Sequence, residues 1–430
     1  MKKIIILLFL LVLNVGTLLA QSQPRFPKPD FKNGHVPPET QIEMPRALAF
    51  EYIDLLVLIG LLSVMSWFVL RKRSRKGILW TSVFSIFYFG FWREGCVCPI
   101  GSIQNITLAI AEVNYVIPIT VIAIFLIPLI FTLFFGRTFC AGVCFMGALQ
   151  DLFIFKPIKI ASWVEKTFSV IPYLYLTLAV LLAATNSSFL ICKYDPFIGF
   201  FRQSANFGMF VFGIIILVTG IFIARPYCRF LCPYGVLLNW MSRVSKWHAT
   251  VTPSECIQCK LCEPSCPVDA IVFPTVGEAK EVGTSGTKRL LKFILVIPLF
   301  MVATGFFVSL FYKPLSTNHP KVDLAEQIAN ELKTGIKSPT QEAIAFNSSG
   351  TSLNQLYTEA AVIRNDFYKG SWMAGIFLGF ILALAFIKSS VYRRQKDYVP
   401  HKGNCISCGR CYKYCPVGKP EISQLNSEKK

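Results

Sequence analysis

Charged residues are scarce in this chain of 430 residues. They make up 16% of the sequence, whereas hydrophobic residues make up 53%, which excludes an ordinary soluble protein and indicates several membrane spans. Acidic residues are especially few, 24 against 43 basic ones. The net charge of +19 does not require a nucleic-acid partner, because basic residues concentrated in cytoplasmic loops orient membrane spans. We therefore expect a membrane protein that binds no nucleic acid.

Histidine is rarer still, and its positions exclude one class of redox protein. There are four histidines, and none lies in a predicted span: His35, His248, His319 and His401. A membrane cytochrome b holds its haems with axial histidines inside the bilayer, so we expect no haem. Walker and G-x-G-x-x-G motifs are also missing from any strand–helix setting, so nucleotide hydrolysis and a bound dinucleotide are not expected.

Cysteine, in contrast, is abundant, and eight of the 15 residues fall in two runs with identical spacing. One run extends from Cys256 to Cys266 and the other from Cys405 to Cys415, and each is followed by proline. This C-x2-C-x2-C-x3-C-P pattern is typical of bacterial ferredoxins, in which the fourth cysteine ligates the other cluster. Zinc is the alternative, because C-x2-C pairs also bind that metal.

The spacing therefore predicts two [4Fe–4S] clusters with crossed ligands. We expect the first cluster to be held by Cys256, Cys259, Cys262 and Cys415. We expect the second to be held by Cys405, Cys408, Cys411 and Cys266.

The other seven cysteines are candidates for additional redox or metal ligands. Two Cys-x3-Cys pairs, Cys140/Cys144 and Cys228/Cys232, each follow an arginine by three residues. On a helix such a pair places both sulfurs on one face, so two pairs at one depth would supply four thiolates to a further centre. Apolar packing is the alternative, since free cysteine is commonly buried. A looser third group is Cys96, Cys98 and Cys192, which would form a disulfide or bind a metal on the outer side.

Apolar runs predict the membrane topology. Residues 1–20 resemble a signal peptide, with Lys2 and Lys3 before an apolar stretch. Seven spans long enough to cross about 30 Å of hydrocarbon follow. They are expected at 52–70, 77–92, 117–135, 168–187, 207–224, 290–312 and 371–389. The loop 71–76 is basic at five of its six positions and is expected inside. Alternation then places 93–116 and 188–206 outside and both ferredoxin motifs in the cytoplasm.

The fold class expected is an all-α polytopic membrane protein with a small cytoplasmic α+β two-cluster ferredoxin module. The divisions expected are a periplasmic segment at 21–51, a five-helix membrane domain at 52–247, ferredoxin halves at 248–287 and 390–430, membrane helices at 288–312 and 371–389, and a periplasmic segment at 313–370. In that last segment, 323–333 and 352–367 are predicted to be amphipathic helices, the second capped by Ser352.

Three stretches together resemble the NosR/NapH-type membrane polyferredoxins: Gly136 to Asp151, Arg225 to Leu238 and Cys256 to Ile271. The resemblance implies a bacterial inner-membrane protein of anaerobic respiration that passes electrons from quinol or a cytoplasmic donor toward a periplasmic reductase, with nitrous oxide or nitrate reduction as the usual setting. NosR-type proteins carry a periplasmic flavin domain before the spans, whereas about thirty residues precede them here. A flavin, if needed, is expected on another chain.

Two functions follow as expectations. The first is an electron-transfer subunit, with or without quinol dehydrogenase activity, that uses the quinone pool and acts in a nitrous oxide reductase-type system. The second is a maturation factor that reduces copper or a thiol while a respiratory enzyme is assembled, with the outer cysteines as its working groups.

Overall fold

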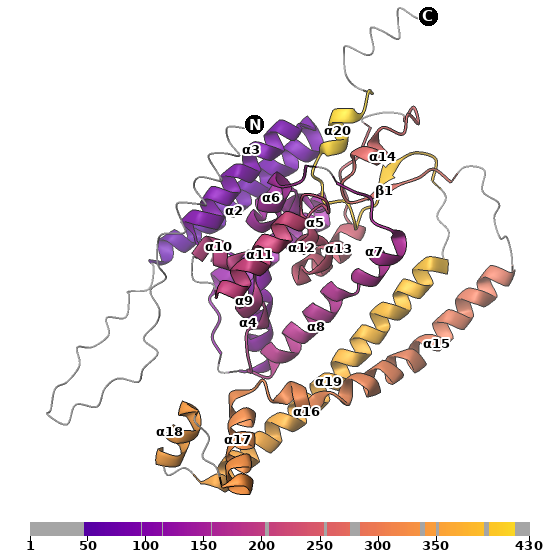
Figure 1. Ribbon diagram of the computed structural model, residues 1–430. Helices are drawn as coiled ribbons and strands as arrows, with labels where there is room; N and C mark the ends of the chain where they lie inside the picture. The colour runs from indigo at the N-terminus through magenta and orange to yellow at the C-terminus, as the bar shows by residue number, and fades with distance from the viewer. Residues whose placement is uncertain are drawn as a thin grey trace, which may run out of the picture.

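The computed structural model describes residues 47–95, 97–113, 115–155, 157–202, 206–252, 256–275, 284–335, 340–349, 352–390 and 395–417. These residues are mostly helical and form an elongated molecule (Figure 1). The predicted signal peptide and nearly all of the segment 21–51 lie outside the described residues, as does Cys96.

The membrane domain is built from helices of very unequal length. Its longer helices are α2 (Leu48–Trp67), α3 (Arg75–Ser85), α4 (Pro99–Ala111), α5 (Ile119–Phe135), α8 (Ile171–Ala184), α11 (Phe207–Thr219) and α13 (Pro233–Arg243). Its shorter helices are α6 (Phe145–Leu152), α7 (Ser162–Phe168), α9 (Leu190–Tyr194), α10 (Ile198–Arg202) and α12 (Pro226–Phe230). Three π-helical segments interrupt it, η1 (Phe68–Lys72), η2 (Ile86–Trp92) and η3 (Phe139–Val143). Such segments commonly mark functional sites in membrane and soluble helices.

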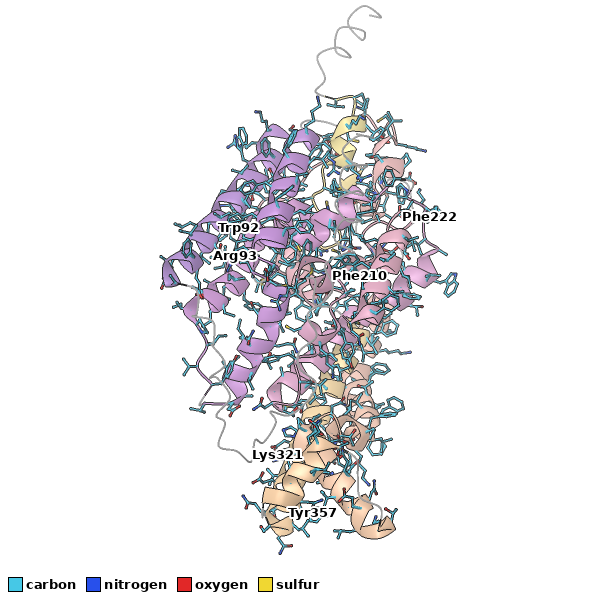
Figure 2. The ribbon with its side chains drawn as sticks, turned by 60° about the vertical axis from the view of Figure 1, so that its left-hand side comes forward. Trp92, Arg93, Phe210, Phe222, Lys321 and Tyr357 are labelled. Atoms are coloured by element: carbon cyan, nitrogen blue, oxygen red, sulfur yellow. The ribbon has the colours of Figure 1, made fainter. Side chains whose placement is uncertain are left out.

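Four helices among the described residues are long and apolar enough to cross a membrane. They cover Ala49–Lys72, Trp163–Ala184, Leu290–Ser309 and Leu353–Ala385, and each overlaps a predicted span. The spans predicted at 117–135 and 207–224 correspond to shorter apolar helices, Ile119–Phe135 and Phe207–Phe222. Large aromatic side chains on this part of the molecule, including Trp92 and Phe222, are exposed on its surface (Figure 2). The chain is therefore a membrane protein, while seven spans remain a prediction.

Residues 93–116, which were predicted to lie outside, contain a helix that was not among the predicted spans. Residues 99–111 form α4, which packs against α5 and α8 and buries Ile100, Ile103 and Leu108. Hydropathy misses this helix because Ser102 and Gln104 lower its average. Both polar side chains are buried, and the Gln104 amide oxygen accepts a hydrogen bond from the Ile191 backbone. Non-helical backbone at membrane depth is tolerated where it is buried within the protein and its polar groups find partners there.

A long helical hairpin separates the two ferredoxin motifs. Helix α15 (Thr284–Ser309) packs along α19 (Leu353–Ser390), and Gly375 of α19 lies directly against the backbone of Thr304, where a side chain would clash. The short helices α16 (Tyr312–Ser316), α17 (Pro320–Thr334) and α18 (Gln341–Ser349) join the two at the end of the molecule opposite the ferredoxin motifs (Figure 1).

The predicted amphipathic helices correspond to α17 and to the first turns of α19. The Ser352 hydroxyl accepts a hydrogen bond from the Gln355 backbone N–H at 3.4 Å, as an N-cap does. Helix α19 continues without interruption past 370, where a boundary was expected. Lys321 and Tyr357 lie at this end of the molecule (Figure 2).

The ferredoxin module forms from segments on both sides of that hairpin. Strand β1 (Ile271–Val272) pairs antiparallel with β2 (Val399–Pro400), with Ile271 opposite Pro400. The short helices α14 (Cys262–Ser265) and α20 (Arg410–Tyr414) pack against each other above them. The two halves predicted from the sequence therefore meet, although the hairpin stands between them in the chain.

Candidate redox centres

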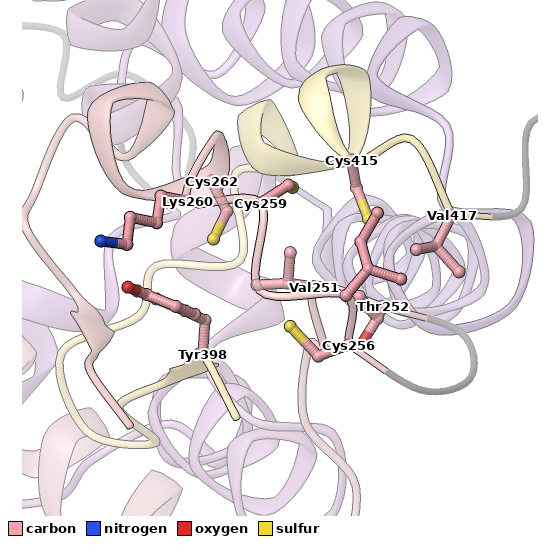
Figure 3. Close-up of a pocket in the computed structure, with 10 residues that line it drawn as sticks. Val251, Thr252, Cys256, Cys259, Lys260, Cys262, Tyr398, Cys415 and Val417 are labelled. Carbon is pink, nitrogen blue, oxygen red and sulfur yellow. The ribbon is translucent and has the colours of Figure 1, made fainter. Parts of the chain in front are cut away.

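The first ferredoxin cavity is lined by cysteines from both motifs. Cys256, Cys259 and Cys262 come from the first motif, and Cys415 comes from the second (Figure 3). The rest of the lining is mainly apolar and includes Val251, Tyr398 and Val417, and the cavity measures about 280 Å³. The structure thus brings together the four cysteines that the spacing assigned to the first cluster.

The second cavity repeats this arrangement with the motifs exchanged. Cys405, Cys408 and Cys411 line a cavity of about 380 Å³ together with Cys266 of the first motif. Burial raises the pKa of the Cys266 thiol to about 11. It likewise raises the pKa of Cys405 to about 12. These thiols are therefore protonated unless a positively charged metal group replaces their protons.

The backbone of the two cysteine loops adopts the same conformation despite different side chains. Gln258 and Lys260 in the first loop have φ values of 52° and 60°. The equivalent Ser407 and Gly409 in the second have 55° and 69°. Non-glycine residues rarely adopt positive φ, so a conformation shared by Gln258 and Ser407 indicates a common functional constraint. Alternating right- and left-handed residues turn successive amides toward an enclosed anion, as iron–sulfur loops require.

The four cysteines of the Cys-x3-Cys pairs also meet, in the core of the membrane domain. The nearest electrostatic neighbours of the Cys232 thiol are Cys228, Cys144 and Cys140. All four pack into one buried cluster. We call these residues the inner thiol group.

Each pair, however, spans a helix break instead of one continuous helix as predicted. Cys140 lies in η3 and Cys144 precedes α6, while Cys228 lies in α12 and Cys232 precedes α13. Because of these breaks, the sulfurs lie within the membrane domain. A continuous helix would instead have placed both sulfurs of a pair on one face of that helix.

Cysteine occupies the N-cap position of three helices whose first turns converge on the inner thiol group. The Gly235 backbone N–H donates to the Cys232 sulfur at 3.3 Å at the start of α13. Cys144 and Cys98 occupy the same N-cap position at the starts of α6 and α4, but their side chains make no cap hydrogen bond there. Helix N-termini carry partial positive charge and favour an anion. The arrangement resembles the interrupted helices that hold anions inside membrane transporters.

Two of the three outer cysteines lie beside this group. Cys98 packs in the same buried cluster as the inner thiol group. A side chain at Gly101 would lie 3.4 Å from the Cys192 sulfur, so the two thiols flank the first turn of α4. Cys96, the third member of the predicted group, lies outside the described residues. We call Cys98 and Cys192 the outer thiol pair.

A buried carboxylate links the membrane domain to the ferredoxin module. Asp151, at the end of α6, forms ion pairs with Arg75, with Arg225 at 3.4 Å and with Arg410 at 3.5 Å. Burial alone would raise the pKa of the Asp151 carboxyl, but the three guanidinium groups outweigh that effect and hold the pKa below its usual range. Arg75 also donates to the Cys408 carbonyl at 2.7 Å. The network therefore fixes the second ferredoxin loop on α6.

The three cysteine groups form one contiguous series. Cys266 packs both with the residues of the first cavity and with those of the second. Cys140 packs against two hydrophobic clusters: one contains Cys408 and is also bordered by Cys405, and the other is the main core that contains Cys232. The sequence did not predict this proximity, because no local pattern joins residue 140 to residue 405.

The donor sets fit an iron–sulfur cluster better than a single ion. Four thiols around a mainly apolar cavity suit a cluster whose irons each take one thiolate. The site chemistry thus favours iron–sulfur over the zinc alternative.

Comparison with known proteins identifies the family. Two models described as 4Fe-4S binding domain match, one at residues 117–162 and 205–251 and the other at 249–272. The first match contains both Cys-x3-Cys pairs, and the second contains the first ferredoxin motif. The regulatory protein NosR of Stutzerimonas stutzeri is 28% identical over 46% of this chain and 29% of its own length. The chain is similar to the NosR/NapH-type membrane polyferredoxins, which these matches support.

Other relatives of this polyferredoxin come from distant organisms. The protein NirI of Paracoccus denitrificans is 29% identical over 32% of this chain, a match that covers 22% of NirI. An uncharacterized protein of Methanocaldococcus jannaschii is 29% identical over 42% of this chain and 77% of its own length. The chain thus spans less than a third of NosR and of NirI. No solved structure matches it. The 4Fe-4S binding domains and these similarities together support an iron–sulfur electron-transfer role for this chain.

Proposed function

We propose that this polyferredoxin passes electrons from quinol or a cytoplasmic donor toward a periplasmic reductase, in a system of the nitrous oxide reductase type. The observation that carries the proposal is the contiguous series of cysteine groups, from the first ferredoxin cavity through the second to the inner thiol group. The similarity to NosR supports the respiratory setting. The inner membrane, with the ferredoxin module in the cytoplasm, is the location that the charge bias of the loops supports.

The ligand assignment follows the two cavities. Cys256, Cys259, Cys262 and Cys415 would hold one [4Fe–4S] cluster, and Cys405, Cys408, Cys411 and Cys266 the other. Clusters bound there would supply one-electron transfer at potentials set by hydrogen bonds, charge and burial. Cys140, Cys144, Cys228 and Cys232 would hold a third centre, which the match of both pairs to a 4Fe-4S binding model supports.

The protein itself contributes position and electrostatics. The π-helical and broken segments place four thiols inside the membrane domain, and the N-termini of α6 and α13, which begin after Cys144 and Cys232, favour negative charge there. The ion pairs of Asp151 hold the second ferredoxin loop against α6. The hydrocarbon layer is about 30 Å thick, so centres confined to a cytoplasmic module would not reach the other side.

Metal content of the anaerobically purified protein tests this assignment directly. We expect about twelve iron atoms per chain with matching sulfide, because three cubane clusters contain four irons each. Low-temperature EPR of the dithionite-reduced protein should show a component beyond two interacting ferredoxin clusters. Iron near eight per chain would leave the inner thiol group without a cluster. Zinc in place of iron would contradict the electron-transfer proposal as a whole.

The outer thiol pair favours the second candidate function, a maturation factor that reduces copper or a thiol of a respiratory enzyme. Cys192 is an exposed thiol beside Gly101 and Cys98, and soft thiolates suit copper in its reduced state. A maturation factor becomes dispensable once its target is built, whereas an electron carrier is needed throughout turnover. Depletion of the polyferredoxin after the reductase has been assembled therefore separates the two functions.

Replacing an outer thiol is expected to change electron delivery separately from iron content. We expect Cys192→Ser to lower electron delivery to an acceptor on the outer side while leaving the iron content unchanged, because Cys192 flanks α4 beyond the inner thiol group. The measurement is the reoxidation rate of the reduced protein by a membrane-impermeant acceptor. Ser187→Ala, at a nearby position between α8 and α9, is the control. A rate equal to that of the parent protein would remove Cys192 from the electron path.

A further inference from the structure

Each Cys-x3-Cys pair is preceded by a buried arginine that reaches the opposite pair. Arg137 belongs to the first motif, yet its Nη2 lies 3.5 Å from the position that a side chain at Gly235 of the second motif would take. Arg225 belongs to the second motif, and its Nη1 lies 3.4 Å from the equivalent position at Gly147 of the first. The two motifs thus exchange arginines across the inner thiol group. A Cβ atom at 147 or 235 would be in ordinary van der Waals contact with the guanidinium of the opposite motif.

Arg225 is held firmly between two cysteine groups. Its side chain is 1% exposed, and its backbone adopts the left-handed region at φ 49°, which arginine rarely does. Its guanidinium donates to the carbonyls of Cys140 and, at 3.0 Å, of Ala141. The thiols among its electrostatic partners are Cys228, Cys408 and Cys140. The charge therefore lies beside the inner thiol group and beside one thiol of the second ferredoxin cavity.

Arg137 makes the matching connection on the other side. Its Nη1 donates to the Gly403 carbonyl at 2.9 Å, two residues before Cys405. It is an electrostatic partner of the Cys405 thiol and of the Cys228 thiol. Each arginine therefore bonds to the backbone of one site and lies within electrostatic range of a thiol of the other.

The positive charge of this region exceeds the negative charge of the described side chains that pair with it. Arg75, Arg225 and Arg410 share the single carboxylate of Asp151. The Nε atoms of Arg137 and Arg225 are buried and have no hydrogen-bond partner among the described residues. A buried cation without compensation is costly, so the site is built for an additional anionic group. Thiolates bound to a cluster would supply that negative charge.

We propose that Arg137 and Arg225 act as a cross-placed cation pair that raises the reduction potential of the centre held by the inner thiol group. Reduction adds a negative charge to a centre, and a fixed guanidinium beside it in a medium of low dielectric stabilises that charge. This inference depends on the proposed function, because it requires a redox centre at the inner cysteines.

The test is a redox titration of the purified holoprotein followed by EPR. We expect Arg225→Gln and Arg137→Gln each to disfavour the reduced inner centre about tenfold, which corresponds to about 59 mV for a one-electron couple. Asp151→Asn should shift the midpoint in the opposite direction, because it removes the carboxylate that offsets Arg225. Arg225→Lys keeps the charge and should stay near the parent value. The first ferredoxin cluster, whose cavity has a separate lining, serves as the internal reference.

The outcomes separate this inference from the function on which it depends. If the parent protein shows no third EPR component, both the proposed redox centre at the inner thiol group and the proposed role of the cation pair are refuted. A third component whose midpoint is the same in the parent, Arg225→Gln and Arg137→Gln would refute the cation pair alone. If a glutamine variant loses its clusters, Asp151→Asn still tests the proposal. A midpoint potential of the inner centre that is unchanged or lowered in Asp151→Asn would contradict it.

Discussion

Replacing Cys140 or Cys228 by alanine is expected to stop electron transfer across the membrane while the two ferredoxin clusters remain assembled. Cys140 belongs to the inner thiol group and packs against the same hydrophobic cluster as Cys405, a cluster that contains Cys408. Without that group, electrons would have to cross most of an apolar layer of about 30 Å, so we expect a loss of at least about tenfold in rate.

Proteoliposomes provide the measurement for these two variants. An impermeant reductant is supplied on the ferredoxin side, and the reduction of an impermeant acceptor enclosed on the other side is followed. Val143→Ala is the matched control, because Val143 is buried between the two cysteines of the first pair and carries no sulfur. Equal rates in Cys140→Ala and the parent protein would exclude the inner thiol group from the path.

The crossed ligation predicts which cluster each fourth cysteine supports. Cys415→Ala should remove the cluster at Cys256, Cys259 and Cys262, although those residues lie about 150 positions earlier in the chain. Cys266→Ala should remove the cluster at Cys405, Cys408 and Cys411. Each variant should lose about four irons and keep the remaining signals.

Double variants decide between crossed and local ligation. If Cys415 and Cys256 serve one cluster, Cys415→Ala combined with Cys256→Ala should lose no more iron than either single variant. If each motif closed its own cluster, the same double variant would lose about twice as much. Tyr414→Phe, an exposed position next to Cys415, is the control for local disturbance of α20.

The sequence by itself determined the ferredoxin module. The repeated spacing from Cys256 to Cys266 and from Cys405 to Cys415 predicted a crossed arrangement, and the structure brings the same two sets of four together. Ligand spacing is a local property of the chain, and the prolines that follow each run add to its specificity. Hydropathy also predicted four spans, at 52–70, 168–187, 290–312 and 371–389. It detects them because it averages over the number of residues needed to cross a bilayer.

Only the tertiary structure decided how the inner thiol group is built. Hydropathy did not detect α4, whose buried Ser102 and Gln104 lower its average, and helical periodicity placed each Cys-x3-Cys pair on one face. The structure instead breaks the chain at Cys144 and Cys232, so that helix N-termini meet at the sulfurs. The sequence showed an arginine before each Cys-x3-Cys pair, but it did not predict which residues of the other segments that arginine contacts. Arg225 reaches Gly147 and Asp151 because the segments that carry the two Cys-x3-Cys pairs pack together. No local pattern encodes contacts between residues so far apart in the chain.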